Sequence, residues 1–114
     1  GTETAEEAAR VFRNLGSDHV IIKCGSEGCY CSDKHFSGWI SAIPVRPVDT
    51  TGAGDCMSAA FIYRILEGDS MEDACRYACA AGSYSTLFVG ASEAKLTDGR
   101  VREFMKTNGD TVLS

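Results

Sequence analysis

The chain has 114 residues, of which 44% are hydrophobic and 24% are charged, and its formal net charge is −5. This length suffices for one domain with a hydrophobic core but not for two. The negative charge gives no reason to expect a nucleic acid or an anionic membrane surface as partner. The apolar runs are too short to span a bilayer and no signal peptide is visible, so we expect a cytoplasmic protein.

The N-terminal half of the chain predicts one helix followed by three strands. Apolar residues at helical spacing indicate a helix over residues 4–15. A β-branched run predicts a strand over 19–23, which leads into a glycine turn at 25–28. Two more strands are expected over 29–32 and 36–43. Prolines then mark an extended lead-in to the next segment.

The C-terminal half predicts three helices, over 54–67, 70–86 and 97–105, with Thr97 or Asp98 as the cap of the last one, and a frayed end after residue 106. Ser70 is suited to cap the second of them, and Asp73 completes a pattern like a capping box. The whole α/β pattern looks incomplete, because two or three strands make a narrow sheet and the chain begins with a helix. We therefore expect the C-terminal part of a larger fold.

The six cysteines argue against a secreted disulfide scaffold, because they fall in regular apolar segments rather than in loops. Cys29 and Cys31 share one face of a strand, and Cys75 and Cys79 are one helical turn apart. A zinc site would need close ligand pairs such as C-x-x-C, and the sequence has none. We therefore predict reduced thiols that pack as small hydrophobic side chains.

The segment 49–55, Asp-Thr-Thr-Gly-Ala-Gly-Asp, stands where an extended stretch is expected to turn into a helix. The backbone N–H groups of such a turn form an anion site. Asp55 would lie beside the bound anion, which suggests phosphoryl transfer to a hydroxyl with Asp55 as base. The alternative is that Asp55 only caps the helix and Asp49 only forms the turn. Neither a Walker A loop nor a Rossmann fingerprint matches the segment.

Segment 49–55 resembles the second signature of the ribokinase-like, or PfkB, family of carbohydrate kinases. Residues 20–28 look like the strand and nucleotide turn of that family, and residues 78–90 like its alanine-rich helix and the glycine that follows. The resemblance covers nearly the whole chain in the right order. It implies a ribokinase-like three-layer Rossmann-type α/β fold. Residues 1–114 would then be its C-terminal portion, which binds the nucleotide and carries the catalytic base.

The resemblance also implies roles for individual residues. Asp55 matches the catalytic base, and the anion hole matches Gly52, Ala53 and Gly54. The nucleotide site matches Lys23, Gly25, Ser26, Gly28 and Cys79. A site for an activating monovalent cation matches Asp49, Thr51, Ser85, Phe88 and Gly90. Lys23 replaces a common threonine, so its ammonium either points at the phosphates or forms the solvated end of a strand.

The implied activity is ATP-dependent transfer of the γ-phosphoryl group to a hydroxymethyl group of a sugar or sugar-like acceptor, with Mg²⁺ and, as activator, K⁺. The implied partners are ATP, the acceptor and the N-terminal part of the same enzyme, and a homodimer is left open. That N-terminal part supplies most of the sugar pocket, a lid and an N-x-x-E motif associated with magnesium, which this sequence lacks. We therefore expect the chain alone to be inactive.

Two alternatives stay open. The acceptor could be a nucleoside, a pseudouridine-like compound or a vitamin instead of a simple sugar. The chain could also be a nucleotide-binding module without catalytic activity.

Overall fold

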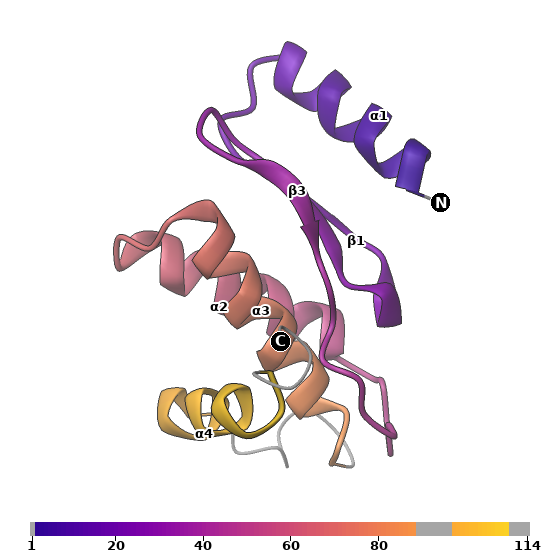
Figure 1. The fold of residues 1–114 in the computed structure, drawn as a ribbon, viewed down its shortest axis with the longest axis vertical. Coiled ribbons are helices and arrows are strands. Elements are labelled where there is room, and N and C mark those ends of the chain that lie inside the picture. Colours follow the sequence, from indigo (N-terminus) through magenta and orange to yellow (C-terminus); the bar gives the residue numbers. More distant parts are fainter. Residues whose placement is uncertain (1, 89–96, 110–114) are drawn as a thin grey trace.

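In the computed structural model, residues 2–88 and 97–109 are described, and they form three layers (Figure 1). Helix α1 (Thr2–Asn14) covers one face of a sheet. Helix α3 (Met71–Ser85) packs on the other face, with helix α2 (Ala53–Leu66) beside it. Helix α4 (Asp98–Phe104) packs against α3 and continues into a π-helical turn, η3 (Met105–Gly109). The expected α/β layering is thus present.

The sheet consists of β1 (Val20–Lys23), β2 (Cys29–Ser32) and β3 (Ser37–Ile40), all antiparallel and in the order β1-β2-β3. A short 3₁₀ turn, η1 (Gly25–Glu27), leads from β1 into β2. β3 is shorter than the strand expected over 36–43. Residues 41–47 have no regular structure, and the two prolines in this stretch have no N–H to donate to a ladder. This segment is therefore free to line a cleft.

Gly28 closes the turn between β1 and β2 in a conformation that other residues rarely adopt, with φ of 105°. A Cβ atom at this position would also collide with the backbone carbonyl of Ile40 at the end of β3. The Gly28 N–H donates to the carbonyl of Gly25 at 3.1 Å, and its own carbonyl accepts the N–H of Cys24 at 2.8 Å. Gly28 thus allows the turn between β1 and β2 to lie directly against β3.

Helix α1 buries only part of its expected apolar face. The small residues Ala5 and Ala9 are buried, whereas Val11, Phe12 and Leu15 are largely exposed. Gly16 follows the helix with φ of 104°, as expected for a C-terminal stop. Large apolar side chains of α1 therefore remain without cover among the described residues.

Side-chain caps begin two of the helices. The Ser70 hydroxyl accepts the Asp73 N–H at 3.1 Å at the start of α3, which confirms the predicted cap. Thr97 rather than Asp98 caps α4, because its hydroxyl accepts the Arg100 N–H at 3.2 Å. The expected fraying after residue 106 is wrong for residues 107–109, which belong to η3, and the remaining tail lies outside the described residues.

The core is centred on α3, whose small residues allow close packing on every side. Tyr77 of α3 donates its hydroxyl hydrogen to the Asp98 carboxylate of α4 at 2.8 Å. Between α2 and α3, Arg64 forms a two-pronged ion pair with Asp69, with both N···O distances at 2.9 Å. Residues of α3 that are fully or almost fully buried are Met71, Ala74, Cys75, Tyr77, Ala78, Cys79, Ala80, Ala81, Gly82 and Ser85.

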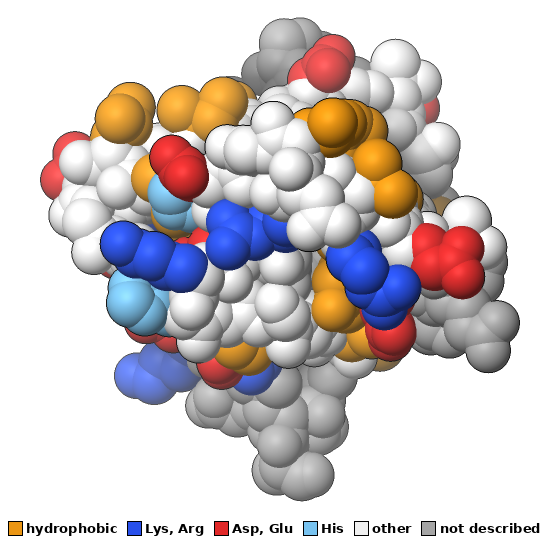
Figure 2. All heavy atoms as spheres, turned by 90° about the horizontal axis from the view of Figure 1, so that it is seen from above, with side chains coloured by type: hydrophobic (Ala, Val, Ile, Leu, Met, Phe, Trp, Pro, Cys, Tyr) orange, Lys and Arg blue, Asp and Glu red, His pale blue; other side chains and the backbone are white. Residues whose placement is uncertain are grey.

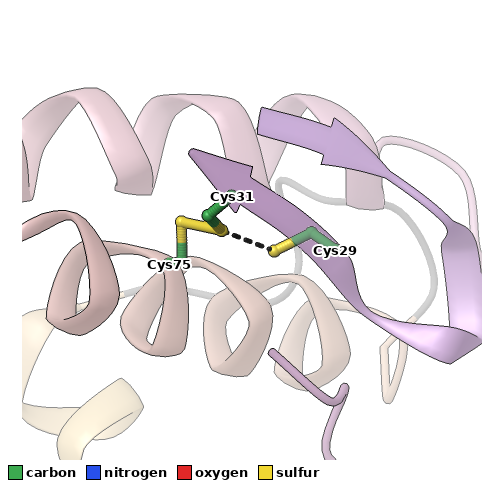
Figure 3. Close-up of side chains that lie close together, drawn as sticks. All are labelled: Cys29, Cys31 and Cys75. Atoms are coloured by element: carbon green, nitrogen blue, oxygen red, sulfur yellow. Dashed lines mark hydrogen bonds between the residues drawn. A yellow bond between two sulfur atoms is a disulfide. The ribbon is translucent and has the colours of Figure 1, made fainter. Parts of the chain in front are cut away.

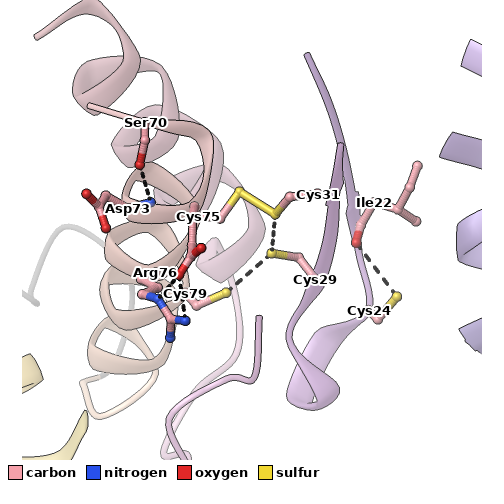
Figure 4. The surroundings of a disulfide bond; sticks show 10 residues. Ile22, Cys24, Cys29, Cys31, Ser70, Asp73, Cys75, Arg76 and Cys79 are labelled. Carbon is pink, nitrogen blue, oxygen red and sulfur yellow. Dashed lines mark hydrogen bonds and ion pairs between the residues drawn. A yellow bond between two sulfur atoms is a disulfide. The ribbon is translucent and has the colours of Figure 1, made fainter. Parts of the chain in front are cut away.

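The prediction that all six cysteines are reduced is wrong, because Cys31 and Cys75 form a disulfide that joins β2 to α3 (Figures 3 and 4). The two cysteines are 44 residues apart in sequence, so spacing along a single element gave no sign of their pairing. Cys29 and Cys79 are buried free thiols, as expected, and Cys24 and Cys56 are half-buried free thiols.

Within residues 2–88 and 97–109, no helix combines the length and the hydrophobicity needed to cross a membrane. On the face shown in Figure 2, Lys and Arg side chains lie in several groups across the middle, with acidic and hydrophobic side chains around them.

Candidate functional site

A cleft of about 460 Å³ opens between the end of β1 with the turn after it, the extended segment 42–47, and the facing sides of α2 and α3. Aliphatic and small side chains make up most of its wall, and a few polar groups stand among them. The lining residues are Lys23, Gly25, Gly28, Ala42, Ile43, Pro44, Val45, Pro47, Thr50, Ala53, Gly54, Met57, Cys79, Gly82, Ser83 and Thr86. An apolar cleft with few polar groups is typical of a small-molecule site.

The first turn of α2 lies at this cleft. Gly52 precedes the helix in the left-handed conformation, with φ of 80°, and makes no side-chain cap. The Ala53 N–H donates to the Thr50 carbonyl at 3.2 Å, and the Cys56 N–H donates to the Gly52 carbonyl at 3.0 Å. The N–H groups of Gly54 and Asp55 come between these and, by helix geometry, have no acceptor within the helix. They form a site suited to an anion.

The Lys23 side chain reaches from β1 to this turn. Its ammonium donates to the hydroxyl of Ser58 at 2.8 Å and to the carbonyl of Gly54 at 3.3 Å. The exposed Lys23 ammonium at the end of β1 therefore lies against the start of α2. A positive charge thus lies beside the N–H groups of the anion site.

Asp55 and Asp49 differ in what their carboxylates do. Asp49 accepts the Thr51 N–H at 2.9 Å and so forms the turn, which confirms that part of the alternative interpretation. Asp55 is exposed in the first turn of α2, and its carboxylate accepts no hydrogen bond from the described residues. The capping role proposed as an alternative for Asp55 has no hydrogen bond to support it, so its carboxylate is open to a ligand.

The residues predicted for a monovalent cation come from two segments that lie side by side. The N–H groups of Val48 and Asp49 both donate to the Thr86 carbonyl, at 2.6 and 3.0 Å, which places Asp49 at the C-terminal end of α3. Ser85 is buried there and donates its hydroxyl to the Gly82 carbonyl at 2.7 Å. The Ser85 carbonyl accepts the Phe88 N–H at 3.4 Å. Gly90 lies outside the described residues.

The cleft brings together most residues predicted for the nucleotide, namely Lys23, Gly25, Gly28 and Cys79, with Ala53 and Gly54 of the predicted anion hole. The side chain of Ser26 lies outside the described part of the chain. Gly52 and Asp55 are sequence neighbours of the lining residues Ala53 and Gly54.

Sequence reasoning missed the opposite wall, formed by residues 42–47 and by Met57, Gly82, Ser83 and Thr86. One signal was the small residue Gly82 in α3, where a Cβ would contact the Ala53 carbonyl and the Met57 side chain at 3.5 Å. The two prolines predict an extended segment, and nothing in the sequence alone indicates that this segment lines a cleft.

The family model for pfkB family carbohydrate kinases matches residues 1–98. The chain belongs to the PfkB family. A ribokinase of Haemophilus influenzae is 34% identical over 111 residues, which cover 93% of this chain and 36% of that protein. The PfkB chain therefore spans about a third of the length of such relatives.

Solved structures show that this PfkB chain has the ribokinase fold. Ribokinase of Arabidopsis thaliana, complexed with ribose and ATP, superposes with a TM-score of 0.79 at 34% identity, covering 89% of this chain and 33% of that one. Phosphofructokinase-2 of Escherichia coli, in complex with potassium, gives a TM-score of 0.79 at 27% identity, covering 90% and 33%. The expected fold and family are thus confirmed.

Proposed function

We propose that residues 1–114 are the C-terminal, nucleotide-binding and catalytic-base portion of an ATP-dependent sugar kinase. One observation carries the proposal: an apolar cleft ends at the first turn of α2, where the Lys23 ammonium and the Asp55 carboxylate also lie. The resemblance to a ribokinase complexed with ribose and ATP supports the same assignment. Because relatives are about three times as long, the remainder of such a protein would supply the acceptor pocket.

The residues of the cleft suit ATP. We assign the adenine and ribose to the aliphatic wall that includes Val45 and Cys79, and the phosphates to the N–H groups of Gly54 and Asp55. A Cβ atom on Gly54 would stand 3.6 Å from the Lys23 ammonium, so glycine leaves that space for a phosphate oxygen. Mg²⁺ held by the phosphates would neutralise part of their charge.

The chemistry follows from the position of Asp55. An acceptor hydroxyl is a poor nucleophile until its proton is taken up. As the hydroxyl oxygen bonds to the γ-phosphorus, the Asp55 carboxylate accepts the proton, the bond between the γ-phosphorus and the bridging oxygen breaks, and ADP leaves. General-base catalysis of this kind contributes roughly 10²–10⁴-fold in rate. Lys23 and the first-turn N–H groups stabilise the negative charge on the phosphates.

We assign the monovalent cation to Asp49, Thr51, Ser85 and Phe88, which come from two neighbouring segments, and to Gly90, which lies outside the described residues. Support comes from the contact between Asp49 and the end of α3, and from the potassium complex of E. coli phosphofructokinase-2. A cation there would lie beside the anion site and would favour bound phosphate. We expect K⁺ in place of a large organic cation to raise the turnover of the full-length protein.

The test compares two aspartates that occupy matching places in two helices of the full-length protein. Asp55 is the third residue after the N-cap Gly52 of α2, and Asp73 is the third residue after the N-cap Ser70 of α3. Either Asp→Asn change removes a favourable charge at a helix N-terminus, worth about 0.3–1 kcal/mol. ADP formation is measured with a panel of sugars and nucleosides, and ATP binding by calorimetry.

We expect Asp55→Asn to lower turnover by about 10²–10⁴-fold while ATP still binds, and Asp73→Asn to leave turnover close to wild type. Equal activity of Asp55→Asn and wild type would contradict the role of base. ATP binding without turnover of any acceptor in the wild type would instead indicate the non-catalytic nucleotide-binding module. Turnover of nucleosides alone would place the acceptor outside the simple sugars.

A further inference from the structure

Four cysteine sulfurs stand in a row between β2 and α3 (Figure 4). The Sγ atom of Cys79 lies 3.5 Å from that of Cys29, and Cys29 lies 3.4 Å from Cys31, which forms the disulfide with Cys75. Figure 3 shows the Cys29 sulfur pointing toward this disulfide. Sulfurs about 3–3.5 Å apart are at the distance from which reacting atoms begin to form a bond.

The row has one end in the cleft and the other in the core. Cys79 lines the cleft, whereas Cys29, Cys31 and Cys75 have no exposed surface. A small thiol in solution therefore has no direct path to the disulfide of the folded protein, but it can meet Cys79. The Cys29 sulfur lies between them and contacts both Cys79 and Cys31.

The contact between Cys29 and Cys79 shifts the pKa values of these two thiols in opposite directions. This contact lowers the pKa of Cys79, although burial opposes the shift, and the nearby Arg76 adds to the lowering. It raises the pKa of Cys29, and burial adds to the rise. Cys79 is therefore the member that more readily becomes a thiolate, which is the reactive form in disulfide exchange.

We propose that Cys29, Cys31, Cys75 and Cys79 form a thiol–disulfide exchange site, through which a small thiol in the cleft reduces the buried disulfide. In the first step Cys79, present as the thiolate, takes up the proton of Cys29, and the Cys29 thiolate so formed attacks the Cys31 sulfur. A bond between Cys29 and Cys31 forms, the bond between Cys31 and Cys75 breaks, and Cys75 leaves as thiolate. We expect the disulfide between Cys29 and Cys31 to be short-lived, because it joins two residues of the same strand.

In the second step Cys79 passes its proton to the Cys75 thiolate and attacks the Cys29 sulfur. A disulfide between Cys29 and Cys79 forms, and Cys31 leaves as thiolate. Two molecules of a small thiol such as glutathione then complete the reaction at the cleft. The first attacks Cys79 to give a mixed disulfide and release Cys29, and the second releases Cys79 and leaves as oxidised glutathione. Two electrons pass from the two thiols to the protein disulfide.

A metal ion is the competing occupant of the same place. The sulfurs of Cys29, Cys31 and Cys75 lie within 4.8 Å of one another, as close as ligands of one cation would be. Two of these three sulfurs are bonded to each other, however, and are not available as thiolates. The structure thus favours exchange over metal binding.

The experiment follows reduction of the full-length protein by glutathione, with free thiols alkylated at intervals and counted by intact mass. Cys29→Ala and Cys79→Ala test the row, and Cys24→Ala and Cys56→Ala are controls for free thiols outside it. We expect the disulfide to be reduced about tenfold more slowly or worse in the first pair, and at the wild-type rate in the controls. If the cysteines were merely structural, loss of packing would speed reduction through unfolding, which is the opposite result.

Peptide mapping gives a second readout, because proteases can separate the four cysteines. Trypsin cuts after Arg76, between Cys75 and Cys79, and chymotrypsin cuts after Tyr30, between Cys29 and Cys31. We expect partly reduced protein to contain a disulfide between Cys29 and Cys79 as well as the original one. Equal reduction rates in all variants, absence of any disulfide in oxidised protein, or one bound zinc lost in Cys29→Ala would each overturn the proposal.

A further consequence rests on the proposed function: ATP in the cleft should shield Cys79 and slow reduction. Binding of ATP is measured separately in the same samples. Bound ATP without slower reduction would contradict access through the cleft, whereas absence of ATP binding would contradict the proposed function and leave the result of the variants standing.

Discussion

The Lys23 side chain makes two contacts that the sequence could not predict. Its ammonium holds the first turn of α2 through Ser58 and Gly54, so it lies where the phosphates of ATP are proposed to bind. We expect Lys23→Met to lower kcat/KM for ATP by roughly 10–100-fold, because a charge-assisted contact to phosphate is lost. Steady-state kinetics of the full-length protein provide the measurement. Lys34→Met, which changes an exposed lysine between β2 and β3, is the control. Unchanged kinetics in Lys23→Met would mean that the ammonium only braces the helix.

A comparison of Gly28 with Gly16 separates the energetic cost of backbone strain from the cost of a steric clash. Both have φ near 105°, but a Cβ at Gly28 would meet the Ile40 backbone, whereas a Cβ at Gly16 would meet nothing within 4 Å. We expect Gly16→Ala to lower the free energy of unfolding by about 1 kcal/mol and Gly28→Ala by roughly 2–4 kcal/mol. Denaturant unfolding of both variants checks this. Equal losses would show that β3 moves aside easily.

At the level of single residues, the sequence predicted positions better than it predicted contacts. The glycines and Asp55 could be named in advance because a turn before a helix constrains residue type locally. The disulfide between Cys31 and Cys75 could not, since it depends on how β2 packs on α3. For the same reason the sequence left two alternatives for Lys23, whose partners are more than 30 residues away.

Helices α3 and α4 are tied together by the hydrogen bond between Tyr77 and Asp98, which makes their packing sensitive to alkaline pH. Burial, followed by this bond to a carboxylate, raises the pKa of Tyr77 to about 12. In the unfolded chain a tyrosine titrates near pH 10, so the folded state holds the proton more tightly. The resulting stability is complete below about pH 10 and is lost as the pH rises to about 12, by about 2–3 kcal/mol in total.

The measurement is the free energy of unfolding at several pH values between 8 and about 12. We expect Tyr77→Phe to cost about 1 kcal/mol at neutral pH and to show a smaller alkaline loss than wild type. Tyr84→Phe is the matched control, because the Tyr84 ring packs on Phe88 and Phe104 while its hydroxyl has no hydrogen-bond partner among the described residues. Parallel pH curves for wild type and Tyr77→Phe would contradict the assignment.

At the level of elements, local signals succeeded where a cap or a stop residue was present. Ser70 begins α3 and Gly16 ends α1 because each satisfies or terminates backbone hydrogen bonding in its own segment. The end of β3 was misjudged, since residues 41–43 have strand-like composition but no neighbouring strand in the described part of the chain. Whether an extended segment becomes a strand or the wall of a cleft is decided by its neighbours in space.

At the level of the whole molecule, α1 and α2 carry large apolar side chains that the described residues do not cover. Leu66 of α2 is 81% exposed and Leu15, the residue that follows α1, is 76% exposed, and Val11, Phe12 and Ile62 are exposed as well. We expect residues 1–114 alone to bind a hydrophobic dye and to show no sugar-dependent ADP formation, because acceptor pocket and lid would be missing. Hydrogen exchange of the full-length protein should show α1 and α2 protected. Detectable turnover by residues 1–114 alone would refute this expectation.

The double hydrogen bond at the Thr86 carbonyl bears on how this protein can diverge during evolution. Both donors and the acceptor belong to the backbone, so substitution of the side chains of Val48, Asp49 or Thr86 leaves the connection between the two segments in place. Only proline at the two donor positions removes an N–H. Descendants of this chain can therefore change the residue types at these three positions, and lose or gain a cation ligand there. The alignment of α3 with the start of α2 is kept in either case.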